Sequence, residues 1–408
     1  MSAREMSAAV RVPGSDRDAA SGSRWLAAIA VYGGALVVGL TLVSFPASST
    51  FLRETHGFSD TQYGAIYLPQ LFAAIAGALG GGALAGRLSL RTMYLVALAC
   101  FALAHALLAV SAFVPSETAL LTVMCATAAF GFGFGFGGGP LNGAVALLFP
   151  RTLYPAITAL HMVAGLGLTV APFVFAWLAQ RALWVAGPLA LLSATILLGI
   201  LTLGARIEPE RGPEPAGKLW PAPAHSGLFW LAALIAVLYS IGEGTFSNWA
   251  LIYVHEERGL PASTAALALT CFWAALTLGR LTASFVVLRV KPIVILVALP
   301  LLSIAAFLYL PLVHSPVTAL LGFALAGVAC SAFFPMLVGF ASDRHPVHVS
   351  WIASMLTAAM MLGVGIGSYA VGALRETLAL PDLYRVSVAY PILVLLALYA
   401  ATRLRKHA

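Results

Sequence analysis

Residues 183–204 read LWVAGPLALLSATILLGILTLG, a run of 22 residues without a charged side chain. A helix of about 20 apolar residues crosses the roughly 30 Å hydrocarbon core of a bilayer. Within that core a helix satisfies all of its own backbone polar groups. Eleven more runs of this kind follow one another between residues 25 and 402. The sequence therefore predicts an all-α protein that spans a lipid bilayer twelve times.

The predicted spans account for nearly all of the chain. Of all residues, 61% are hydrophobic, only 9% are charged and 38 are glycine, which allows close helix packing in lipid. The fourth span is long enough to include some loop. We place the spans at residues 25–50, 59–86, 92–114, 117–147, 155–179, 183–204, 227–254, 263–288, 291–313, 315–340, 349–374 and 384–402.

A polar interval over residues 205–226 divides the spans into two groups of six. It is rich in proline and in charges of both signs, a composition typical of a linker. We expect one six-helix bundle over residues 25–204 and a second over 227–402. Residues 1–24, which lack a signal-peptide pattern, and residues 403–408 are expected to be short tails. Two such bundles commonly enclose a transport path near the bilayer midplane.

Basic residues are distributed unevenly between the two sides of the predicted bundle. If the N-terminus is inside, 17 of the 22 Lys and Arg residues fall on the inner side. Cytoplasmic flanks carry this excess in membrane proteins, so we expect both termini and the linker to be cytoplasmic. The net charge of +7 then reflects topology, and no nucleic-acid partner is predicted. The five outer residues are Arg53, Arg181, Arg258, Arg375 and Arg385.

The sequence offers no setting for an enzyme active site, a metal or a cofactor. It contains no phosphate-binding loop, zinc cluster or serine nucleophile setting, and no water-exposed domain that would hold one. All four cysteines lie inside predicted spans, and we interpret them as small core residues. They are Cys100, Cys125, Cys271 and Cys330.

The segment that follows the second span reads GALAGRLSLR from Gly82 to Arg91. It resembles the loop pattern G-x-L-a-D-r-x-G-r-[KR] of the major facilitator superfamily, with matches at Gly82, Leu84, Arg87 and Arg91. The resemblance implies two six-helix halves and transport by alternating access. It also implies that Gly82, Arg87 and Arg91 belong to a gating loop. Gly86 replaces the acid that helps to latch the cytoplasmic side in the family, so gating here is expected to differ.

Three further stretches are similar to the fucose/proton symporter group of that superfamily. They are Asn142 to His161, YSIGEGTFSNW from Tyr239 to Trp249, and Phe272-Trp273 followed by Gly279-Arg280. The similarity implies uptake of a sugar or a similar small polar solute. That group carries acids in its first and fourth helices. Here the first span offers only hydroxyl groups and Gly138 stands at the fourth-span position, so proton coupling at another residue is a hypothesis of its own.

Glu243 is the one acidic residue that lies deep inside a predicted span. An ionised carboxylate at that depth costs at least a few kcal/mol, so it needs a partner, a wet cavity or a proton. We predict that Glu243 couples proton movement to transport. The alternative is a structural role, in which it caps a helix broken at Gly242 and Gly244 or makes a fixed hydrogen bond between helices.

Arg280 lies about 13 Å from the inner end of its predicted span, whereas Glu243 lies about 24 Å into its own. The offset of roughly 10 Å is unfavourable for a direct ion pair. Three roles therefore stay open for Arg280. It binds an anionic solute, joins a water-mediated network with Glu243, or extends its side chain to the cytoplasmic interface.

Other polar residues inside the spans are candidates for contact with the solute. Asn142 and His161 flank Arg151 at nine and ten residues, which places them at similar depth on consecutive antiparallel helices. They either line the path together or form a structural hydrogen bond with each other. Further candidates are amides and indoles of the kind that bind sugars, although each also suits helix packing: Gln70, Asn248, Trp249 and Trp273.

Glycine patterns in the fourth and fifth spans allow other readings. The run from Gly131 to Gly139 formally contains G-x-G-x-x-G, but no strand precedes it. We expect close helix packing there, or a bend near Pro140. The stretch from Gly167 to Pro172 partly resembles a fifth-helix exporter pattern, which keeps export open as an alternative.

Together these patterns predict a monomeric permease of a bacterial inner membrane that takes up a small polar solute by alternating access. Protons are a candidate second substrate. The main alternative is a proton-driven exporter of amphipathic or drug-like compounds. A solute-sensing or scaffolding membrane protein is a second alternative, since the acid of the gating loop is absent.

Overall fold

The computed structural model describes residues 15–84, 87–149, 153–205, 207, 222–343, 345 and 349–407. Within these ranges the chain forms 12 helical segments long and apolar enough to cross a membrane, which confirms the all-α prediction. The elements are α1 (Ser15–Ala47), α2 (Ser49–His56), α3 (Asp60–Ala65), α4 (Tyr67–Leu84), α5 (Leu90–Val110), η1 (Ser111–Phe113), α6 (Ser116–Leu148), α7 (Leu153–Ala179), α8 (Ala186–Gly204), η2 (Ala222–His225), α9 (Gly227–Asn248), η3 (Ile252–Glu257), α10 (Ala262–Val286), α11 (Pro292–Tyr309), η4 (Leu310–Leu312), α12 (Pro316–Cys330), α13 (Phe333–Ser342), α14 (Val349–Leu374), α15 (Leu380–Ser387) and α16 (Ala389–His407).

Several helices differ from the predicted spans at their ends. α1 begins at Ser15 and α16 continues to His407, so both helices extend into stretches that we expected to be tails. A helix has no reason to stop at the bilayer surface, because water satisfies its exposed polar groups. The fourth span holds no loop, since α6 runs unbroken from Ser116 to Leu148 with Pro140 inside it. Of the predicted linker over residues 205–226, the structure describes 205, 207 and 222–226, which include η2, and the remainder lies outside the described residues.

Several of the spans are broken into separate helices, and two of these breaks lie inside the second and the tenth spans. The second consists of α3 and α4, which meet at Ile66. The tenth consists of α12 and α13, which are separated by a turn at Ser331 and Ala332. Breaks in membrane helices leave backbone groups that neighbouring side chains must satisfy. This requirement matters for the tenth span, as described below.

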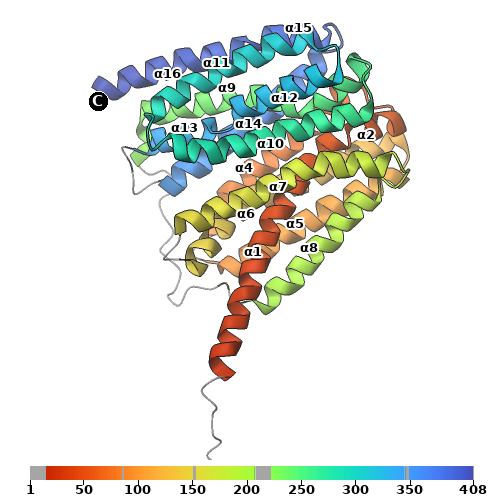
Figure 1. The fold of residues 1–408 in the computed structure, drawn as a ribbon. Helices are drawn as coiled ribbons and strands as arrows, with labels where there is room; N and C mark the ends of the chain where they lie inside the picture. The colour runs from red at the N-terminus through yellow and green to blue at the C-terminus, as the bar shows by residue number, and fades with distance from the viewer. Residues whose placement is uncertain are drawn as a thin grey trace, which may run out of the picture.

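The helices group in space as they do along the chain. Figure 1 shows α1 to α8 on one side of the molecule and α9 to α16 on the other. We call these groups the first and the second half. The two halves meet where α4 packs against α14 and where α7 packs against α10. In the second contact, a Cβ atom at Gly165 of α7 would lie 2.4 Å from Cγ2 of Thr277 on α10. Residues from both helix pairs are therefore positioned to face the boundary between the halves.

The glycine run of α6 confirms the prediction of close helix packing. Cβ atoms at Gly131 and Gly135 would lie 2.1 Å from backbone oxygens of α4. Cβ atoms at Gly133 and Gly137 would lie within 3 Å of atoms of α5. Residues four apart share one helix face, so alternate glycines serve two neighbouring helices.

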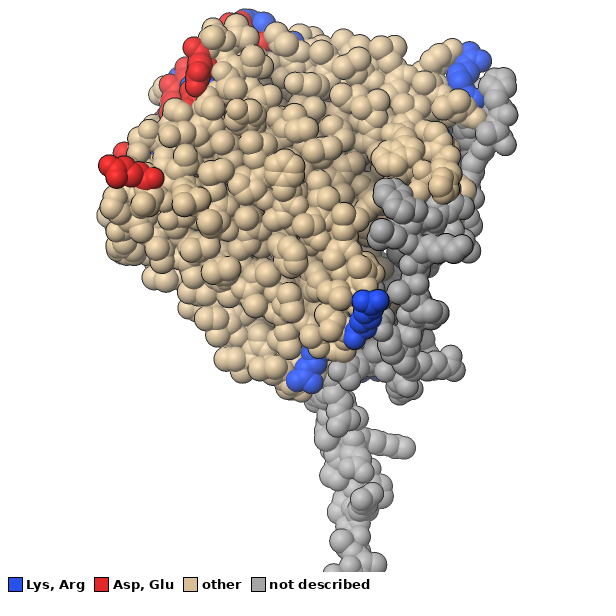
Figure 2. Space-filling view, turned by 180° about the vertical axis from the view of Figure 1, so that it is seen from behind, with Lys and Arg blue, Asp and Glu red and all other residues tan. Residues whose placement is uncertain are grey.

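Charge separates the molecule into two ends with an apolar belt between them. Figure 2 shows acidic side chains gathered at one end and isolated basic side chains at the other. We call the first, where α2 and α15 lie, the acidic end, and the opposite one the basic end. Large apolar side chains such as Phe72, Leu121 and Leu396 are exposed, as expected for surfaces that face lipid.

Candidate functional site

Glu243 lies on α9 and lines a cavity inside the second half. The cavity has a volume of about 20 Å³, enough for one ordered water molecule but not for a sugar. Its walls come from α9, α11, α12, α13 and α16, and most of the lining side chains are apolar. The residues that line this cavity all belong to the second half. The polar or titratable lining residues besides Glu243 are Tyr239, Ser303, Cys330 and Tyr390.

One oxygen of the Glu243 carboxyl group, Oε2, is buried without a hydrogen-bond partner among the described residues. Tyr239, one helical turn earlier on α9, donates its hydroxyl hydrogen to the carbonyl oxygen of Cys330 at 2.7 Å. The same hydroxyl also lies close enough to interact with Glu243. A buried, unpaired ionised carboxylate is costly, so this geometry suits a protonated Glu243.

Arg280 on α10 donates a hydrogen bond to a backbone carbonyl group at the break between α12 and α13. Its Nε atom donates to the carbonyl oxygen of Ser331 at 2.9 Å. The preceding Gly279 permits this approach, because a Cβ there would lie 2.5 Å from Cβ of Ser331. The guanidinium group interacts electrostatically with Glu243 without forming an ion pair. Arg280 thus makes a hydrogen bond at the break, and its other two guanidinium nitrogens make no hydrogen bond to the residues that the structure describes.

His161 on α7 lies near Arg280, across the boundary between the halves. His161 is exposed, Arg280 is partly buried, and the two groups interact electrostatically. Both lie about one helical turn from the Gly165–Thr277 contact, toward the basic end of the molecule. The residues at this position are therefore reachable by water and belong to different halves.

Asn142 on α6 is also exposed, but it makes no structural hydrogen bond to His161. Its amide nitrogen donates to the carbonyl oxygen of Gly138 in its own helix at 2.9 Å. Among the described residues, no group donates a hydrogen bond to its amide oxygen.

Asn248 and Trp249 lie toward the acidic end, where the halves are in contact. The amide of Asn248 donates to the hydroxyl of Ser368 at 2.7 Å. Its backbone carbonyl oxygen accepts from Tyr63 of the first half at 2.9 Å. Trp249 is fully buried, and its ring packs edge-on against Tyr63. These two residues therefore join the halves, and neither is brought close to His161.

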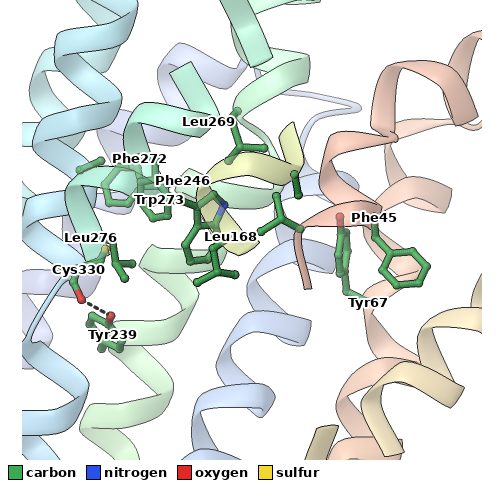
Figure 3. Packing of buried hydrophobic residues seen from close by; sticks show 14 of the residues in the cluster. Phe45, Tyr67, Leu168, Tyr239, Phe246, Leu269, Phe272, Trp273, Leu276 and Cys330 are labelled. Carbon is green, nitrogen blue, oxygen red and sulfur yellow. Dashed lines mark hydrogen bonds between the residues drawn. The ribbon is translucent and has the colours of Figure 1, made fainter. Parts of the chain in front are cut away.

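Trp273 and Gln70 are both buried at 5% exposure. Figure 3 shows Trp273 of α10 pointing toward Leu168 of α7, with Tyr67 of α4 farther into the first half. The indole nitrogen of Trp273 has no hydrogen-bond partner among the described residues, which leaves a polar atom available in an apolar surrounding. Gln70 lies where α4 crosses α6, since its backbone carbonyl oxygen faces Gly131.

The predicted gating loop lies at the basic end. A Cβ atom at Gly82 would meet open space, and Arg87 is exposed. Arg91 donates to the carbonyl oxygen of Leu203 at the end of α8, within the first half. A cation at a helix C-terminus is favourable, so Arg91 ties α5 to α8. Gly86 lies outside the described residues.

An ion-pair network at the acidic end was not predicted. Asp60 of the first half binds both Arg53 and Arg375, and Arg375 belongs to the second half. Arg53 binds Glu256 of the second half at 2.9 Å, and Arg375 binds Glu257 at 3.0 Å. A signal was present in the sequence, since Arg53 and Arg375 are two of the five basic residues on the side where such residues are rare.

Comparisons with known proteins agree with this architecture. The Major Facilitator Superfamily profile matches residues 25–370. The chain belongs to this superfamily. No group of three or more His, Cys, Asp or Glu side chains placed to bind a metal occurs among the described residues.

Two curated relatives match part of the chain. An uncharacterised MFS-type transporter of Yersinia pestis is 26% identical over 53% of this chain and 55% of its own length. An uncharacterised transporter of Sinorhizobium fredii is 29% identical over 37% of this chain and 40% of its own. The matched region thus spans about half or less of each relative.

Solved structures share the whole fold at low sequence identity. The nucleoside transporter NupG superposes with a TM-score of 0.70, 17% identity and coverage of 93% of this chain and 99% of its own. The transporter FucP in an outward conformation superposes with a TM-score of 0.65 and 14% identity, and the match covers 93% of this chain and 99% of FucP. A bacterial homolog of the human lysosomal transporter Spinster superposes with a TM-score of 0.70 and 16% identity, and the match covers 94% of this chain and 97% of that protein. These similarities establish the fold of a membrane transporter.

Proposed function

We propose that this transporter is a permease that takes up a sugar or a similar small polar solute by alternating access, coupled to protons through Glu243. The observation that carries the proposal is the position of His161 and Arg280. They come from different halves, lie close together, and are exposed and partly buried, respectively, on the basic-end side of the Gly165–Thr277 contact. A solute held between them contacts both halves, so its binding can bias their relative arrangement.

The proposed solute site combines groups that suit a hydroxylated molecule. His161, Arg280 and the open amide oxygen of Asn142 supply hydrogen-bond donors and acceptors at the basic-end side. Trp273 offers an apolar ring with an unpaired N–H deeper between the halves. Asn248, Trp249 and the ion pairs around Asp60 close the acidic end. A nucleoside transporter and FucP are among the structural neighbours, and a polar solute for this chain is in keeping with both.

Glu243 is the proposed proton site because it is buried, lacks a partner for Oε2 among the described residues and lies beside a cavity with room for water. Because the residues that line its cavity all belong to the second half, protonation would act through that half and not by direct contact with the solute. We further propose a monomer in a bacterial inner membrane with both termini cytoplasmic. This agrees with basic side chains at the end where α16 finishes.

A ligand panel tests the solute class. The detergent-purified protein is heated with sugars, nucleosides, organic acids and lipophilic drugs at pH 5.5 and 7.5. A ligand at 100 times its dissociation constant stabilises the folded state by about 2.7 kcal/mol. We expect hits among sugars or related polyols, and loss of the shift in Asn142→Ala and His161→Ala. Hits confined to lipophilic compounds would favour the exporter instead.

A further inference from the structure

The break in the tenth span is held by two side chains from neighbouring helices. Tyr239 of α9 donates to the carbonyl oxygen of Cys330, the last residue of α12. Arg280 of α10 donates to the carbonyl oxygen of Ser331, within the turn. The Tyr239 ring also stacks on Phe333, the first residue of α13, with ring centroids 4.8 Å apart. Tyr239 therefore touches both sides of the break.

Tyr239 has one hydroxyl hydrogen and two candidate acceptors. One is the Cys330 carbonyl oxygen, which accepts it in this structure. The other is the carboxyl group of Glu243, one turn away on the same helix and on the same cavity. An ionised carboxylate forms roughly twice as strong a hydrogen bond as a neutral acceptor. A protonated carboxyl group loses that advantage, so its charge decides which acceptor the hydroxyl prefers.

The geometry points to Tyr239 as a positioning residue that carries the charge state of Glu243 to the break between α12 and α13. When Glu243 is neutral, the hydroxyl holds the Cys330 carbonyl and α12 stays tied to α9. When Glu243 loses its proton, the O–H bond rotates to the carboxylate, and the Cys330 carbonyl is released. The only covalent bond that breaks is the O–H bond of the Glu243 carboxyl group, and its proton passes to water, for which the adjoining cavity has room. This inference rests on the proposed proton site and specifies how it acts.

The surroundings of Glu243 leave Tyr239 as the group suited to this role. Among the described residues near it, the titratable or charged ones besides Tyr239 are Arg280 on α10, Cys330 on α12 and Tyr390 on α16. The Nε atom of Arg280 is already engaged by Ser331, while its positive charge remains near the carboxylate that forms. Ser303 of α11 lines the cavity but does not titrate. Of these side chains, Tyr239 is the one bonded to the last carbonyl of α12.

Hydrogen–deuterium exchange of the purified full chain tests the inference without a solute. The readout is the exchange of peptides covering residues 326–340 at pH 5.5 and 8, corrected for the intrinsic pH dependence of amide exchange. Wild type is expected to exchange about fivefold faster at the higher pH, the change that one ordinary hydrogen bond gives. In Glu243→Gln these peptides should exchange slowly at both pH values. In Tyr239→Phe, which keeps the stacked ring, they should exchange rapidly at both pH values. Peptides from α5 report global unfolding.

Tyr390→Phe is the matched control, because Tyr390 lines the same cavity from α16. It should keep the wild-type response. The inference is overturned if Tyr239→Phe retains the pH response, or if wild type shows none while solute uptake depends on Glu243. If the exchange results are as expected but solute uptake does not depend on Glu243, the role of Tyr239 is supported and the proposed proton coupling is contradicted.

Discussion

Arg280, at the break between α12 and α13, is a polar residue with both a structural hydrogen bond and a candidate role in solute binding. Arg280 was a candidate for solute binding, a network with Glu243 or extension to the interface, and the structure shows it bonded to the Ser331 carbonyl. The sequence placed Arg280 inside the eighth span, and the structure has it within α10. It did not locate the break, because Pro335, which suits the first turn of α13, looks no different in the sequence from Pro140, which lies inside the unbroken α6. The sequence therefore could not identify the carbonyl oxygen of Ser331 as the partner of Arg280.

Replacing Arg280 with alanine should lower the stability of the protein by about 1–3 kcal/mol, because the Ser331 carbonyl loses its donor in a mostly apolar surrounding. The measurement is the thermal midpoint of the detergent-purified variant. Arg289→Ala, at an exposed basic-end position, is the control. An unchanged midpoint for Arg280→Ala would contradict the structural role.

His56, at the end of α2 and outside the membrane helices, gives a pH prediction. Burial lowers the pKa of His56 below its ordinary 6.5, and a hydrogen bond with the backbone of Ser111 partly opposes the shift. A histidine with a lowered pKa binds protons more readily when unfolded, so its stabilisation is complete above about pH 6.5 and falls as the pH drops below it. His56→Gln should lose less thermal stability than wild type between pH 7.5 and 5.5. Equal losses would rule out this contribution.

Helix packing is the level at which the sequence was most informative. Uninterrupted apolar runs placed all twelve spans, because hydrophobic length is a direct physical requirement of the bilayer. The glycine run of α6 also predicted close packing. Helix rotation is not determined by a single sequence, so the sequence could not show that Glu243 faces a cavity within the second half.

Alternate glycines of α6 give a prediction about packing. A Cβ at Gly135 would lie 2.1 Å from the carbonyl oxygen of Ala74, a backbone atom that cannot move independently of α4. Overpacking of this kind typically costs about 1–3 kcal/mol. Gly135→Ala should therefore lower the thermal midpoint, whereas Gly138→Ala, with open space around it, should not. Equal effects of both variants would contradict the packing of α6 on α4.

At the scale of the whole molecule, the halves are joined by charge at the acidic end. Asp60, Arg53 and Arg375 connect α2 and α3 with η3 and the end of α14. The sequence predicted two halves and an uneven charge distribution. It could not pair these charges, because Asp60 and Arg375 are separated by 315 residues.

Arg375→Gln should weaken the contact between the halves at the acidic end. The partly buried pairs contribute up to about 1 kcal/mol each, so the ratio of molecules closed to molecules open at this end should fall by up to about fivefold for each pair lost. Spin labels at the exposed Glu54 and Leu378 would report a shift toward longer distances. Arg385→Gln is the control, because Arg385 pairs with Asp382 three residues away in α15. A distance distribution unchanged by Arg375→Gln would contradict a role for these ion pairs in holding the two halves together.

The most direct test of the central claim is uptake into proteoliposomes of a sugar that stabilises the protein in the ligand panel. A pH gradient, acidic outside, provides the driving force, and Glu54→Gln at an exposed site serves as the control. We predict that wild type and Glu54→Gln accumulate the sugar above its external concentration, and that Glu243→Gln only equilibrates it. Gradient-driven accumulation by Glu243→Gln at the wild-type level would contradict proton coupling through Glu243.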